Sequence, residues 1–172
     1  KTGDGMDPTV TLGPVISGAS RDRIMKHINK AISEGAELLL DGRDVKEFKK
    51  GFFVKPTIFD KVNNKMTMFH EEIFGPVVGL IKVNTLDEAI DIINSSPYGN
   101  TTSVFTTSGK AARHFQYKAN PSMIGVNIGV PAPMSFFSFG GTNNSCYGDL
   151  KAHGKMSISF YTDTKVSIVR WF

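Results

Sequence analysis

The chain contains little cysteine and no long apolar run. These two features exclude an intrachain disulfide and a membrane-spanning helix. Cys146 is the only cysteine among 172 residues, so an intrachain disulfide is excluded and a reducing compartment fits. No apolar run approaches the roughly 20 residues that a membrane-spanning helix needs. Residues 1–5 lack the pattern of a signal or transit peptide, and they also lack an initiator Met. We therefore expect no membrane partner, a cytoplasmic location (or the mitochondrial matrix in a eukaryote), and a position 1 that is not the natural start.

Excess charge of either sign is also small. Lys and Arg together number 20 and Asp and Glu number 16, which gives a net charge of +4. The basic residues are scattered rather than gathered in one stripe, so we expect no nucleic-acid partner. The spacing of the histidines does not suit a metal ion, and we expect no metal site. These histidines are His27, His70, His114 and His153.

The middle of the chain predicts an α/β fold. Apolar strands are expected at residues 77–83, 101–106 and 123–127, with helices opened by Thr85 and Ser108 between them. Strands joined by amphipathic helices in the order β-α-β-α-β favour a parallel sheet with right-handed crossovers. The fold class that follows is α/β with a parallel β-α-β sheet.

The first part of the chain predicts one helix and two extended segments. Ser20 is placed to cap the helix and Gly35 to end it. A short buried strand follows at residues 38–40. Pro56 interrupts residues 52–59 and favours edge or irregular structure there. The residues expected on the inner face of the helix are Ile24, Ile28, Ala31 and Ile32.

The last part of the chain departs from this alternation. Residues 129–147 are rich in Gly, Pro, Ser, Asn and Phe, and a loop of this length in a compact domain is usually functional or disordered. Strands are predicted at residues 157–161 and 165–171. The second carries apolar side chains on both faces, so we expect it to pair with a strand of this chain or of another copy.

One short motif combines the groups that a ligand would need. Residues 71–76 read Glu-Glu-Ile-Phe-Gly-Pro and precede the apolar strand at 77, and open α/β sheets bind ligands at strand ends. A carboxylate can accept hydrogen bonds from a sugar diol, and an aromatic ring can lie against a planar heterocycle. From periodicity alone, a solvated turn at Glu71 and Glu72 with Phe74 in the core is equally compatible.

The motif resembles the Glu-Ile-Phe-Gly-Pro signature of the NAD(P)-dependent aldehyde dehydrogenases. Further segments are similar to that family in family order, at residues 11–17, 53–58, 97–106, 125–127 and 139–141. Within the family, residues 131–134, 137–139 and 148–149 look like the CoA-acylating methylmalonate-semialdehyde dehydrogenase branch. The arginines typical of that branch are absent from residues 143–147, which read Asn-Asn-Ser-Cys-Tyr.

This resemblance implies a chemistry in which a cysteine thiolate attacks the aldehyde, NAD accepts the hydride and CoA takes the acyl group. The products would be acetyl-CoA or propionyl-CoA from malonate or methylmalonate semialdehyde. No catalytic residue is expected in this chain, because the nucleophilic cysteine would lie upstream of Lys1 and no dinucleotide-binding Gly-rich motif is present. Cys146 is not expected to replace it, because no adjacent His or Lys lowers its pKa. The chain alone should be inactive.

The resemblance also assigns binding residues. Glu72 would hold the nicotinamide ribose and Phe74 would lie behind the nicotinamide, while Pro133, Phe137 and Phe139 would line the substrate entrance. An aromatic-rich core loop is an equally good interpretation for any single residue of the last group.

The resemblance implies that the chain has two regions, and two alternative functions stay open. Residues 1–156 would be the C-terminal part of a catalytic domain, and residues 157–172 would form an oligomerisation tail of a homodimer or homotetramer. One alternative is a non-catalytic binding or assembly module that keeps the fold. The other is a fragment of a general NAD(P)-dependent aldehyde dehydrogenase outside the CoA branch.

Overall fold

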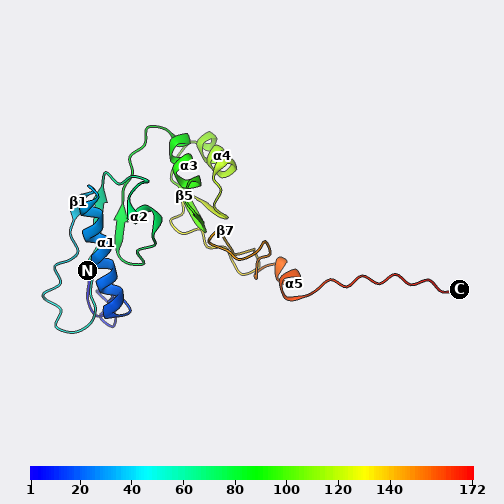
Figure 1. The fold of residues 1–172 in the computed structure, drawn as a ribbon, viewed down its shortest axis with the longest axis horizontal. Coiled ribbons are helices and arrows are strands. Elements are labelled where there is room, and N and C mark those ends of the chain that lie inside the picture. The colour runs from blue at the N-terminus through cyan, green and yellow to red at the C-terminus, as the bar shows by residue number, and fades with distance from the viewer. The chain divides into compact units, whose positions relative to one another are not determined.

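The computed structural model describes all residues from 1 to 172 and divides them into two compact units, Lys1–Val83 and Asn84–Phe172. Both units combine helices with short strands, and parallel strand pairs occur in each (Figure 1). The predicted α/β class is therefore confirmed.

Helix α1 (Gly18–Ser33) is the longest element of the first unit (Figure 1, blue). Its N-cap is Ser17, whose side-chain oxygen accepts a hydrogen bond of 3.1 Å from the backbone N–H of Ser20. The prediction that Ser20 is the cap is therefore wrong, because a serine three residues earlier satisfies that free N–H. Gly35 follows the helix with φ of +96°, the left-handed conformation that the predicted stop requires.

The first unit contains a three-stranded sheet in the order β1 (Glu37–Leu40), β2 (Thr57–Asp60), β3 (Val77–Gly79). β1 runs antiparallel to β2, and β2 runs parallel to β3. The expectation of edge or irregular structure around Pro56 is wrong for residues 57–59, since β2 is the central strand. Pro56 lies just before β2, so its missing N–H removes no hydrogen bond from the ladder.

Side chains from α1 and the sheet form one apolar core in this unit. Ile24, Ile28, Val54 and Phe59 are fully buried. Ile32, which was expected to face inward, is half exposed instead. The short helix α2 (Thr67–His70) follows β2 in the chain and leads into residues 71–76. This core fixes the position of α1 beside the segment that carries the Glu-Glu-Ile-Phe-Gly-Pro motif, because Ile73 packs against it.

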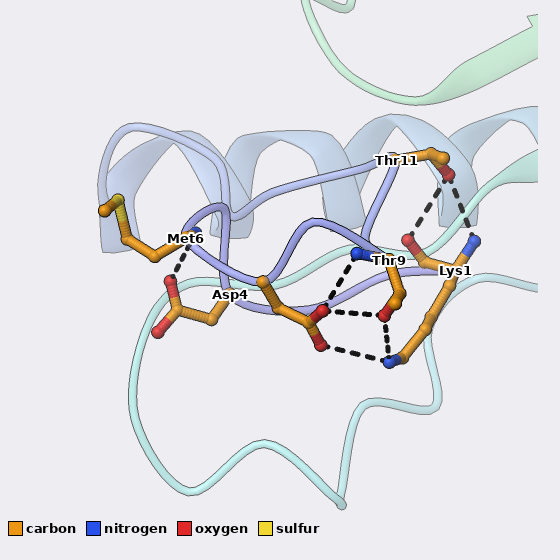
Figure 2. A network of polar contacts seen from close by, with 6 residues as sticks. Lys1, Asp4, Met6, Thr9 and Thr11 are labelled. Carbon is orange, nitrogen blue, oxygen red and sulfur yellow. Dashed lines mark hydrogen bonds and ion pairs between the residues drawn. The ribbon is translucent and has the colours of Figure 1, made fainter.

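A polar network closes the first loop of the chain (Figure 2). The Lys1 ammonium donates to Asp7 at 3.1 Å and to the Thr9 hydroxyl at 2.7 Å, while the terminal amine donates to the Thr11 hydroxyl at 3.1 Å. Hydrogen bonds from the Thr9 hydroxyl and backbone, together with Lys1, lower the pKa of Asp7. All of these groups are exposed, so they shape the loop and contribute little to the free energy of unfolding.

The second unit contains α3 (Leu86–Asn94), β5 (Thr101–Val104), α4 (Gly109–Lys118) and β6 (Met123–Val126). β5 and β6 pair in parallel, as predicted. The caps are also confirmed, because the hydroxyls of Thr85 and Ser108 accept N–H hydrogen bonds in the first turns. However, β3 pairs with β2 in the first unit, so the predicted single sheet is divided.

Two further pairings organise the segment after β6. β4 (Tyr98–Gly99) and β7 (Thr142–Asn143) form a short antiparallel pair, which ties the Gly- and Ser-rich segment back to the turn before β5. Asn127 adopts a left-handed φ of 57°, and its side-chain amide both accepts from and donates to the backbone of Thr106. The strand that precedes Asn127 therefore stops at a defined point.

The predicted strand at residues 157–161 is wrong, since Met156–Tyr161 form helix α5. A short apolar run has no periodicity that distinguishes the two structures, and here the N–H of Ser157 closes a turn onto the carbonyl of Gly154. Residues 162–172 form neither helix nor strand (Figure 1, red), because a lone strand has no ladder to join. No helix in the structure combines the length and the apolar character needed to cross a membrane.

Candidate cofactor site

Residues 71–76, called the 71–76 loop below, connect α2 to β3. The loop begins where the N–H of Glu71 bonds to the carbonyl of Thr67 at 2.9 Å. Phe74 has a left-handed φ of 51° and leaves 76% of its surface exposed. Such a conformation costs about 1–3 kcal/mol in a residue with a side chain. The backbone therefore presents an aromatic ring to solvent at a strained position.

The two carboxylates of the loop have different surroundings. Glu71 lies with a carboxylate oxygen 3.7 Å from Nε2 of His27. Glu72 is exposed, and its carboxylate forms no hydrogen bond or ion pair within the chain. Of the two, Glu72 is the carboxylate whose acceptor oxygens remain free for a ligand hydroxyl.

The loop is held from α1. One Arg23 guanidinium nitrogen donates to the backbone carbonyl of Glu72 at 3.1 Å, and another donates to that of Ile73 at 2.5 Å. Gly75 lies so close to α1 that a Cβ there would stand 2.6 Å from Cδ1 of Ile24. Sequence reasoning missed Arg23, because the contact spans about 50 residues and no local pattern marks it.

The residues of the loop fit part of a dinucleotide. A free carboxylate at Glu72 suits a ribose diol, and the exposed ring of Phe74 suits a planar heterocycle. The chain has no Gly-x-Gly-x-x-Gly motif that could hold the phosphates. Glu72 and Phe74 thus lie in one loop, with the carboxylate and the ring both accessible to a ligand.

The predicted substrate-entrance residues all lie in the second unit. Phe137 lines a groove of about 790 Å³ between residues 135–138 and 152–158. Phe139 stands beside it, with its ring centroid 5.9 Å from that of His153. Pro133 is half-buried and does not line the groove. The three residues therefore belong to one segment, and of the three Phe137 lines this groove.

The surroundings of Cys146 correct one expectation. The Lys151 ammonium lies 3.2 Å from the Cys146 sulfur, although the sequence suggested no neighbouring Lys. Hydrogen bonding from the Gly141 backbone and from Lys151 lowers the pKa of the Cys146 thiol, while Asp149 opposes that shift. Lys151 was visible in the sequence five residues later, but only the folded loop brings the two groups together.

The fold and this loop define a class of protein. The chain matches the aldehyde dehydrogenase family over residues 1–167, and it belongs to that family. It is 44% identical to malonate-semialdehyde dehydrogenase 1 of Oceanobacillus iheyensis, over 100% of this chain and 36% of that protein. It is 46% identical to malonate-semialdehyde dehydrogenase 2 of Geobacillus kaustophilus, over 99% of this chain and 36% of that protein. The chain thus spans about a third of the length of these relatives.

Solved structures of aldehyde dehydrogenases have the same fold as this chain. Methylmalonate-semialdehyde dehydrogenase from Oceanimonas doudoroffii superposes with a TM-score of 0.93 at 40% identity, over 99% of this chain and 36% of that one. An aldehyde dehydrogenase of Mycobacterium tuberculosis, solved with NAD⁺, superposes with a TM-score of 0.85 at 36% identity, over 94% of this chain and 33% of that one. The fold predicted from the family resemblance is therefore confirmed.

Proposed function

We propose that this chain forms part of an NAD-dependent, CoA-acylating aldehyde dehydrogenase that converts malonate or methylmalonate semialdehyde into acetyl-CoA or propionyl-CoA, with loss of the substrate's carboxyl group. The observation that supports this most is the TM-score of 0.93 with a methylmalonate-semialdehyde dehydrogenase over 99% of the chain. The identities of 44% and 46% to malonate-semialdehyde dehydrogenases add to it.

In this proposal the chain is a C-terminal portion. Residues 1–156 belong to the catalytic domain, and residues 157–172 belong to an oligomerisation tail. The nucleophilic cysteine and the dinucleotide-binding domain lie in residues that precede Lys1. The 172 residues alone are then inactive, since they lack the thiol that attacks the aldehyde.

The 71–76 loop supplies binding groups for NAD. Bound NAD would provide the hydride acceptor. Glu72 accepts hydrogen bonds from the ribose hydroxyls, and Phe74 packs its exposed ring against the nicotinamide. Both residues hold the cofactor in one orientation, which is how positioning contributes to the rate. The entrance for the semialdehyde is lined in part by Pro133, Phe137 and Phe139.

The activity is tested with the protein expressed at its natural length. Malonate semialdehyde, NAD and CoA are supplied together, and both NADH and acetyl-CoA are measured. We expect the two products in equal amounts, and no acetyl-CoA when CoA is omitted. Turnover by the isolated 172 residues would contradict the assignment of the nucleophile, and absence of turnover by the natural-length protein would contradict the proposed activity.

A second candidate is a general NAD(P)-dependent aldehyde dehydrogenase. The observation that favours it is the Asn-Asn-Ser-Cys-Tyr sequence at residues 143–147, where the CoA-acylating branch has two arginines. The chain therefore departs from the pattern of that branch at these residues. Oxidation of benzaldehyde without CoA, at a rate above that of malonate semialdehyde with CoA, would favour this candidate.

A third candidate is a non-catalytic assembly module. The tail favours it, because Val166, Ile168 and Trp171 are exposed in the single chain and an extended apolar segment can pair with a strand of a second copy. The same tail serves a homodimer or homotetramer of the enzyme. Self-association of the natural-length protein without any dehydrogenase activity would favour the module, whereas self-association with activity would favour the enzyme.

A further inference from the structure

We propose that Arg23 is a positioning residue that sets the geometry of the 71–76 loop for NAD binding. The inference rests on the proposed function, because it gives Arg23 a role only if Glu72 and Phe74 hold the cofactor. It concerns a residue of α1, far from the loop in sequence, that does not itself touch the ligand.

The hydrogen bonds of Arg23 are directed entirely at the loop. Its guanidinium donates to the carbonyl oxygens of Glu72 and Ile73, at 3.1 and 2.5 Å. It forms no other hydrogen bond and no ion pair with a carboxylate. A guanidinium is a planar fork with several donors, which suits two neighbouring acceptors, and hydrogen bonds from a charged donor are stronger than neutral ones. The charge of Arg23 is therefore used to orient two successive peptide groups.

Those two peptide groups flank the residue between the proposed ligand contacts. Glu72 precedes Ile73 and Phe74 follows it, so the direction of both side chains depends on how the peptides around Ile73 are turned. Phe74 also has the left-handed φ of 51°. A strained backbone persists only where its surroundings over-determine it. Arg23 supplies hydrogen bonds to the two residues immediately before the strained one.

Neighbouring residues of α1 hold the same loop at other points. Ile24 lies against Gly75, where an added Cβ would stand 2.6 Å from its Cδ1. His27, one helical turn after Arg23, lies 3.7 Å from Glu71. The helix is itself anchored, because Ile24 and Ile28 are fully buried. A buried helix face therefore acts as a fixed support, and Arg23 supplies its hydrogen bonds to the carbonyls of Glu72 and Ile73.

The test compares NAD affinity in three forms of the natural-length protein. Arg23→Met removes both hydrogen bonds, and Arg21→Met makes the same change on the same helix at a residue that pairs with Asp22 and lies over Phe52. We expect the dissociation constant for NAD to rise roughly tenfold or more in Arg23→Met, since hydrogen bonds to a charged group are lost. Arg21→Met should bind NAD as the parent does.

A second readout separates positioning from general stability. The KM for NAD should rise in Arg23→Met while the KM for the aldehyde stays unchanged, and amide exchange should accelerate at residues 72–75. If Arg23→Met does not fold, Arg23→Lys is used, because it keeps the charge and loses the fork geometry; its dissociation constant should rise about threefold. An unchanged affinity in the folded variant overturns the role of Arg23. Failure of the parent protein itself to bind NAD overturns the proposed function, and the inference with it.

Discussion

The Lys151 ammonium lies 3.2 Å from the sulfur of Cys146 and 2.7 Å from the carbonyl oxygen of Gly141. It joins the only cysteine of the chain to the Phe-Gly-Gly segment that resembles the family's. A cation beside a thiol favours the thiolate, so the pair makes Cys146 more reactive than an isolated cysteine. This holds whether or not Cys146 has a part in the proposed reaction.

Replacement of Lys151 by Met should make Cys146 less reactive near neutral pH. The Gly141 backbone and Lys151 lower the pKa of the thiol in the folded chain. Loss of the ammonium raises that pKa, so less thiolate is present near neutral pH and alkylation by iodoacetamide slows. The apparent pKa from the pH dependence of alkylation measures the change. Lys155→Met is the control, because Lys155 does not contact the thiol, and an equal effect of both variants would refute the pairing.

Glu34 should make the first unit sensitive to acid. Glu34 is the C-cap of α1, and its carboxylate accepts hydrogen bonds from the hydroxyl of Thr67 at 2.6 Å and from the backbone N–H of the same residue at 2.8 Å. These bonds, the hydroxyl first, lower the pKa of Glu34 below 4.5. The unfolded chain then binds the proton more readily, so the stabilisation is present above that pH and is lost as the pH falls through the folded pKa.

The variant Glu34→Gln tests this directly. It should be less stable than the parent at neutral pH, and the gap in the free energy of unfolding should shrink as the pH is lowered below 4.5. Urea unfolding at several pH values measures the gap. In a Thr67→Val background the gap should be smaller at neutral pH, because the hydroxyl donor is gone. A gap that is independent of pH would contradict the linkage.

Gly42 should not tolerate a side chain. A Cβ at this position would stand 1.9 Å from the backbone carbonyl oxygen of Lys55 and 2.6 Å from the hydroxyl of Thr57. The backbone cannot easily withdraw, because the N–H of Lys55 donates to the carbonyl of Gly42 at 2.9 Å. We expect Gly42→Ala to cost about 3 kcal/mol in the free energy of unfolding. Gly13→Ala is the matched control, since nothing lies within 4 Å of its Cβ, and equal stabilities of the two variants would contradict the packing.

Local patterns predicted the parts of the fold that depend on a few neighbouring residues. The caps at Thr85 and Ser108 follow from a hydroxyl and an N–H three residues apart. The stop at Gly35 follows from one residue's freedom to adopt a positive φ. The parallel pairing of β5 and β6 follows from two apolar strands with a helix between them. Each of these features is encoded within a short stretch of sequence.

Features that depend on contacts between residues far apart in the sequence were not predicted. The hydrogen bond from Arg23 to the carbonyl of Ile73 joins residues 50 positions apart. The contact of Lys151 with Cys146 depends on how the loop between them folds. Whether Ser157 and its neighbours become strand or helix depends on what they pack against, because a short apolar run fits both. For the candidate site, the motif indicated Glu72 and Phe74 by resemblance. The hydrogen bonds from Arg23 to their loop depend on the folded structure.

The two adjacent carboxylates of the 71–76 loop offer the sharpest test of the proposed cofactor contact. Glu72 has a free carboxylate, whereas Glu71 faces His27 at 3.7 Å. In the natural-length protein, Glu72→Gln should raise the dissociation constant for NAD roughly tenfold, because a charge-assisted hydrogen bond to the ribose becomes a neutral one.

The matched change Glu71→Gln should leave that constant nearly unchanged. Both substitutions remove one negative charge from the same loop, one residue apart, so any general effect of charge on NAD affinity would appear in both. Isothermal titration calorimetry with NAD measures the dissociation constant of each variant. A larger effect at Glu71 would reverse the assignment, and it would place the ribose on the side of the loop that faces α1 instead of the side that is open to solvent.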